Sequence, residues 1–153
     1  MGAGVWGSVF FALFALMIII SRPLVGKVYA RYGSRFVIYP GVGLFIVGLA
    51  ILGVVSTPVG IICTAPLLGL GYGAAQPAFQ ALAVQSAPIE RAGVSTATYF
   101  LALDIAVGAG SVILALIANA LGYQSLYQIT SLIMIIALAL YHFVIRKHSY
   151  IAE

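Results

Sequence analysis

The feature that most constrains this chain is the confinement of its positive charge to three short segments, separated by long uncharged stretches. The seven basic residues are Arg22, Lys27, Arg31, Arg35, Arg91, Arg146 and Lys147. No residue between Phe36 and Ile89 is charged. Basic residues that flank apolar segments gather on the cytoplasmic side of membrane proteins. The pattern therefore predicts a polytopic membrane protein with all three basic segments on one face of the bilayer.

Composition argues against a soluble protein and against a nucleic-acid partner. The chain is 63% hydrophobic and only 7% charged, whereas soluble domains carry roughly 25% charged residues. The net charge of +4 comes from residues beside apolar runs, where lipid headgroups are the nearer partner. Cys63 is the only cysteine, which excludes an intrachain disulfide, and its apolar neighbours predict a buried, unreactive thiol.

The apolar stretches predict five transmembrane helices in one all-α membrane domain that covers residues 1–153. A helix needs about 20 apolar residues to cross the roughly 30 Å of hydrocarbon in a bilayer. The predicted spans are about 5–21, 36–55, 59–83, 94–121 and 126–144, with turns at 56–58 and 122–125. The first span lacks the basic segment and cleavage site of a signal peptide, so we expect it to be retained. An odd number of spans places the amino end outside and the basic carboxyl end in the cytoplasm.

Asp104 is the only acidic residue within a predicted span. An ionised Asp near the bilayer centre costs about 2.5 to 3.5 kcal/mol, so its side chain is expected to face protein or water. Helical spacing places Gly108 and Ser111 on the same face, which predicts close packing against another helix. Asp104 is therefore a candidate for a proton or cation relay, and the alternative is a structural hydrogen bond to a neighbouring helix.

The third predicted span combines small, polar and helix-bending residues. Gly69 and Gly73 form a G-x-x-x-G pair that favours helix packing. Pro77 interrupts the backbone hydrogen bonding and permits a bend. Gln76 and Gln80 lie on the same face as the glycines, so they are candidates to line a translocation path. Amide hydrogen bonds between helices are the equally consistent alternative.

The sequence contains no pattern that predicts an enzyme, a metal site or a cofactor. His142 and His148 share the carboxyl tail, and no Ser/His/Asp arrangement or phosphate-binding loop is present. His142 lies one turn before Arg146, where an imidazole can reach the membrane interface.

The first basic segment contains four residues that match a known loop motif. The matching residues are Gly26, Arg31, Gly33 and Arg35. They resemble the G-x-x-x-D-R-x-G-R-R loop of the major facilitator superfamily, with Ala30 in place of the acid and Ser34 in place of one basic residue. Gly33 permits the tight turn, and the Arg residues face helix carbonyl ends and lipid phosphates.

A longer run, formed by residues 69–77, 88–93 and 104–110, is similar to the tenth span, loop and eleventh span of drug/proton antiporters in that superfamily. Gly110-Ser111 stands where those antiporters have Gly-Pro. The resemblance implies helices 8 to 12 of a twelve-helix secondary active transporter in the cytoplasmic membrane. It implies efflux of a small molecule coupled to protons.

The same resemblance implies that the amino half and the seventh span are missing. Such transporters hold the substrate between two halves that rock against each other, so we expect this chain alone not to form a complete path. The expected partners are the lipid bilayer, a small-molecule substrate and the missing amino-terminal half. The alternative is a non-transporting membrane fragment or a small helical subunit that binds partner spans.

Overall fold

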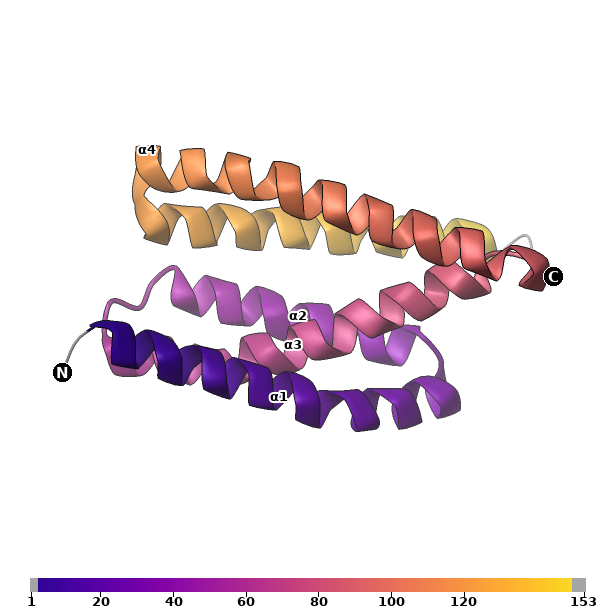
Figure 1. The fold of residues 1–153 in the computed structure, drawn as a ribbon, viewed down its shortest axis with the longest axis horizontal. Helices are drawn as coiled ribbons and strands as arrows, with labels where there is room; N and C mark the ends of the chain where they lie inside the picture. Colours follow the sequence, from indigo (N-terminus) through magenta and orange to yellow (C-terminus); the bar gives the residue numbers. More distant parts are fainter. Residues whose placement is uncertain (1–2, 150–153) are drawn as a thin grey trace.

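A computed structural model describes residues 3–149, with side chains described for residues 4–144. The described residues form helices and no strand, which confirms the predicted all-α class. The elements are α1 (Ala3–Tyr32), α2 (Arg35–Leu52), α3 (Pro58–Gln85), the short 3₁₀ helix η1 (Ile89–Arg91) and α4 (Ala92–Ser149). Figure 1 shows them as a bundle of elongated rods that run along one common direction.

Helix α4 is not straight, because it reverses direction at Gly122. The backbone there has φ 81° and ψ 164°, a combination that is essentially restricted to glycine. Figure 1 shows the residues before and after this point as two antiparallel rods, orange and yellow. We call residues 92–121 the first leg of α4 and residues 123–149 the second leg.

The last two predicted spans correspond to the two legs of the single helix α4, so the described chain has four long helices where five were predicted. Four helices in the described part of the chain are long and apolar enough to cross a membrane: Gly4–Tyr32, Arg35–Leu52, Pro58–Gln85 and Ile89–Val144. The expected loop at 122–125 is reduced to Gly122, since one residue in this conformation suffices to reverse the helix. At 1.5 Å per residue, each leg is about 40 Å long, which is enough for its own crossing.

Helix α1 also continues past its predicted end at Ser21 and runs to Tyr32, with Pro23 inside it. Gly33, at φ 84°, then makes the turn into α2, and its amide donates to the Tyr29 carbonyl oxygen at 2.9 Å. Figure 1 places this turn, the end of α3 and the start of α4 at one end of the bundle. The second leg of α4 returns to the same end, so the three basic segments gather there.

Helix α3 lies between α1 and α2 and makes its most extensive contacts with them. A Cβ atom added at Gly69 would lie 2.6 Å from the Phe14 carbonyl oxygen of α1, and one at Gly71 would lie 2.6 Å from the Phe45 amide nitrogen of α2. Glycine therefore permits both neighbours to approach the α3 backbone. The core joins α2 and α3 through Val37, Ile38, Val42, Ala75 and Ala78, and through Leu49, Leu52 and Leu68.

The outer helices bury little of their surface. None of the most apolar stretch of α4, and 6% of that of α1, is buried within the described chain. Apolar side chains on these faces contact lipid in a membrane. Cys63 is exposed as well, so the prediction of a buried thiol was wrong: its apolar neighbours in sequence indicate a lipid-facing position rather than a protein core.

Candidate functional site

An open cleft lies between α1, α3 and the first leg of α4, in the half of the bundle nearer the basic end. Its volume is about 540 Å³, within the range of about 300 to 1,000 Å³ found for small-molecule sites. The lining residues are Arg22, Val25, Gly26, Tyr29, Ala30, Gln76, Pro77, Ala78, Gln80, Ala81 and Phe100. The cleft thus includes both glutamines that the sequence marked as path candidates.

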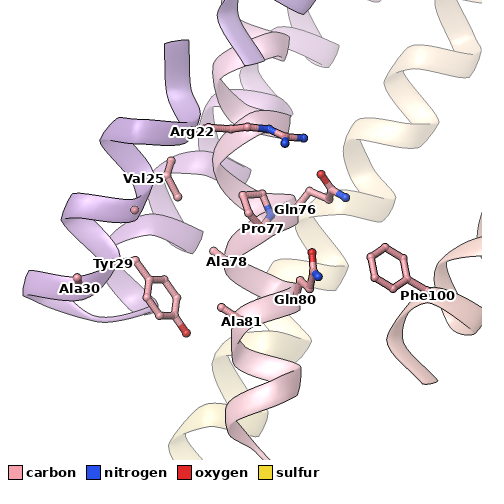
Figure 2. Close-up of a pocket in the computed structure, with 11 residues that line it drawn as sticks. Arg22, Val25, Tyr29, Ala30, Gln76, Pro77, Ala78, Gln80, Ala81 and Phe100 are labelled. Carbon is pink, nitrogen blue, oxygen red and sulfur yellow. The ribbon is translucent and has the colours of Figure 1, made fainter. Parts of the chain in front are cut away.

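The lining of the cleft follows helical periodicity on two helices. On α1 the residues recur at spacings of three and four from Arg22 to Ala30, so they form one face of the helix. On α3 Gln76 and Gln80 are one turn apart. Figure 2 shows both amides directed to the same side of α3, with Phe100 facing them from the first leg of α4. The cleft therefore has polar groups on two helices and an aromatic ring on the third.

Two hydrogen bonds hold the helices around the cleft. The Tyr99 hydroxyl donates to the backbone carbonyl oxygen of Gln76 at 3.2 Å, which joins the first leg of α4 to α3. The Tyr29 hydroxyl donates to Gln85 Oε1 at 2.9 Å, which joins α1 to α3. Pro77 lacks an amide hydrogen, so the Gly73 carbonyl oxygen has no helical donor at this point. The two tyrosine hydrogen bonds thus hold α1 and the first leg of α4 against α3. The side-chain amides of Gln76 and Gln80 form no hydrogen bond with any other described residue.

Arg22 is the functional candidate that the sequence reasoning missed. The first span was predicted to end at Ser21, which placed Arg22 in a loop. In the structure α1 continues for ten residues beyond Arg22, about 15 Å at 1.5 Å per residue. The signal was present in the sequence, because Arg22, Val25, Gly26 and Tyr29 have the spacing of one helical face.

Asp104 does not line the cleft. It is exposed on the first leg of α4 and makes no ion pair or hydrogen bond with another described residue. It lies four residues after Phe100, so both side chains project from the same face of the leg. This spacing puts Asp104 on the same face of the leg as Phe100, one turn farther from the basic end.

The predicted packing residues divide into two groups. Gly69 and Gly73 face α1, where an added Cβ atom would meet the backbone of Phe14 or Ile18. Gly108 has no atom within 4 Å of an added Cβ. The Ser111 hydroxyl donates within its own helix to the Gly108 carbonyl oxygen at 2.9 Å. At Gly108, the first leg of α4 is therefore not covered by any described part of this chain.

The motif residues lie at and near the turn between α1 and α2. Gly33 forms the turn, Gly26 lines the cleft, and the Arg31 guanidinium carbon lies 5.5 Å from the ring centre of Tyr32. Arg35 begins α2. On the same side of the bundle the Tyr39 hydroxyl lies 2.7 Å from His142 Nδ1, which ties α2 to the second leg of α4. Within the described residues, no group of His, Cys, Asp and Glu could hold a metal ion.

Comparison with known proteins gives a family for the chain. A family model described as Major Facilitator Superfamily matches residues 2–151. No curated protein and no solved structure matches the chain. The family match spans nearly the whole sequence, and the helical architecture of long apolar rods agrees with it. The chain belongs to the Major Facilitator Superfamily of membrane transporters.

Proposed function

We propose that the chain supplies the substrate-facing helices of a secondary active transporter that exports small amphipathic molecules in exchange for protons. The cleft between α1, α3 and α4 gives this proposal its strongest support, because the side-chain amides that line it form no hydrogen bond with any described residue and are therefore available to a substrate. In this proposal Gln76 and Gln80 contact the substrate. In this proposal the protein also lies in the cytoplasmic membrane, with its basic end inside and its amino end outside.

Asp104 is proposed as the proton-carrying group. Ionisable residues at membrane depth face water or protein and mark ion or proton pathways. Asp104 lies on the same face of the leg as Phe100, so a proton on its carboxyl group and a substrate in the cleft would occupy one continuous face of the leg. Replacing Asp104 by Asn removes the titrating group at almost constant volume. In cells of the natural host, Asp104→Asn is expected to abolish the dependence of export on the pH gradient.

We further propose that a second helical bundle completes the path. The cleft is open, and the face of α4 that carries Gly108 has no cover from the described residues at that position. Transporters of this superfamily bind substrate between two helical halves. Vesicles that contain this chain alone are therefore expected to show no substrate accumulation above that of protein-free vesicles. Accumulation driven by the chain alone would contradict this part of the proposal.

The same uncovered face supports a second candidate function, a helical membrane subunit that binds partner spans without transporting anything. The two functions differ in whether the cleft holds water. A transport path must admit water and solutes from one side of the membrane, whereas a packing face is closed by the partner or filled by lipid.

Thiol labelling in membranes tests the proposed path directly. In a Cys63→Ala background, Gln76→Cys and Gln80→Cys are expected to react with a membrane-impermeant maleimide added from the basic side. The native chain provides the matched control, because its single Cys63 is an exposed residue of the same helix but does not line the cleft. Because Cys63 faces lipid and not water, it is expected to react at least tenfold more slowly than the cysteines at positions 76 and 80. Equal protection of all three positions would contradict a water-accessible path and favour the subunit.

A further inference from the structure

The cleft carries positive charge, and no acidic residue is among those that line it. Arg22 is the charged residue among those that line it. The carboxylates in the described part of the chain belong to Glu90 and Asp104, and neither lines the cleft. No described residue forms an ion pair or hydrogen bond with the Arg22 side chain. A guanidinium group is always charged and offers only hydrogen-bond donors. The Arg22 side chain can therefore bind a negatively charged acceptor from a ligand.

The other polar groups of the cleft can serve the same kind of ligand. Figure 2 shows the guanidinium group of Arg22 extending across α3 toward the side on which Gln76 and Gln80 project. Each glutamine amide has two N–H donors, and neither makes a hydrogen bond within the described residues. Phe100 and Val25 supply apolar surface beside these donors. One ligand can therefore place an oxyanion against Arg22 and the amides and an apolar body against Phe100.

We propose that the cleft recognises an amphipathic organic anion, a molecule with a carboxylate or phosphate group attached to an apolar body. This inference rests on the proposed transport function and narrows its substrate class. Arg22 binds the oxyanion by charge-assisted hydrogen bonds, which are shorter and stronger than neutral ones. Gln76 and Gln80 orient the anion, and Phe100 holds the apolar part.

An anionic substrate also agrees with the direction of transport. Export of an anion and entry of a proton both move net positive charge inward. A membrane potential that is negative inside therefore drives both steps. The exchange is then sensitive to voltage as well as to the pH gradient, unlike a neutral exchange of one cation for one proton.

A phospholipid phosphate offers the same oxyanion chemistry as a solute. Arg22 is exposed and could reach a headgroup from the edge of the bundle. We assign a solute as the ligand because the cleft brings hydrogen-bond donors from α1 and α3 together with an aromatic ring from α4. A lipid headgroup bound at the surface of one helix would not require contacts from three helices. Binding of a soluble anion and retention of an anionic lipid are measured separately, which distinguishes the two sources.

The test measures binding of 2-naphthoate to the whole chain in nanodiscs of phosphatidylcholine, with 2-naphthylmethylammonium as the cation of similar size. Naphthoate is expected to bind at least tenfold more tightly than the cation after subtraction of binding to empty discs. Arg22→Gln is expected to weaken naphthoate binding at least tenfold, and Arg22→Lys less than Arg22→Gln. Lys27→Gln removes a nearby exposed cation that does not line the cleft and is expected to change binding less than twofold.

Each of the following results would overturn the assignment: equal binding of anion and cation, equal effects of Arg22→Gln and Lys27→Gln, or no naphthoate binding with Arg22-dependent retention of phosphatidylglycerol. In the last case the oxyanion is a lipid phosphate. Retained phosphatidylglycerol is measured by native mass spectrometry in discs that contain it. If the thiol positions at 76 and 80 react with maleimide while naphthoate fails to bind, only the anion assignment fails. If those positions are also protected, the transport function fails with it.

Discussion

The hydroxyl group of Tyr99 donates to the backbone carbonyl oxygen of Gln76 across 3.2 Å, and this bond joins the first leg of α4 to α3 at the cleft. The bond therefore sets the separation of α3 and α4 at Gln76, whose side-chain amide is a proposed substrate contact. The distance is at the long end for an O–H···O hydrogen bond, so we expect a modest contribution to stability.

Tyr99→Phe removes this hydrogen bond and keeps the ring. Hydrogen bonds between membrane helices contribute on average about 0.6 kcal/mol, so the free energy of unfolding in mixed micelles is expected to fall by about 0.5 to 1 kcal/mol. Tyr123→Phe is the matched control, because Tyr123 is exposed and forms no hydrogen bond with a described residue. If both variants lose the same stability, the bond to Gln76 does not hold α4 against α3.

Gly69→Ala tests the close packing of α3 against α1. An added Cβ would lie 2.6 Å from the Phe14 carbonyl oxygen and 2.7 Å from Met17 Cβ, so the two helices must separate. Overpacking of this kind costs about 1 to 3 kcal/mol, which denaturant titration can measure. The control is Gly108→Ala, where no atom lies within 4 Å. Because Ala favours helix by up to about 1 kcal/mol, Gly108→Ala is expected to be neutral or stabilising. A destabilising Gly108→Ala would show that another surface covers this face.

Gly122→Ala tests the reversal of α4. A residue with a Cβ at φ 81° and ψ 164° is strained by about 1 to 3 kcal/mol. The variant is expected to lose that much stability, or to relieve the strain by straightening α4 so that the legs separate. Distance measurement between spin labels on the two legs distinguishes these outcomes. Gly110→Ala, in a regular part of the first leg with open space around it, is expected to leave the distance unchanged. An unchanged distance and stability in Gly122→Ala would contradict the role of Gly122.

The sequence predicted the class of fold well because charge and hydropathy act over whole helices. Uncharged stretches near 20 residues long predict spans without any knowledge of packing. For the same reason, the first predicted span ends at Ser21, where charge appears, and not where helical geometry ends. A proline and four basic residues lie close together at that point, yet α1 continues to Tyr32.

The candidate site could be predicted only in part. Gln76 and Gln80 could be identified because amides within an apolar span are conspicuous. The spacing of Arg22 and Val25 indicates one helical face. The positions of Arg22 and Tyr99 at the cleft, however, depend on how α1 and α4 pack beside α3, and that packing is set by close contacts such as Gly69 with Phe14. Gly122 was predicted as part of a loop of several residues, whereas the positive φ of one glycine makes the whole turn.

The most direct test of the central claim is the sidedness of three cysteines, Lys27→Cys, Tyr123→Cys and Lys147→Cys, each introduced with Cys63→Ala. In oriented membrane vesicles, a membrane-impermeant maleimide is expected to label positions 27 and 147 from the same side and position 123 from the opposite side. That result would show that both legs of α4 cross the bilayer and that the basic segments share one face. Labelling of positions 27 and 147 from opposite sides would contradict the account.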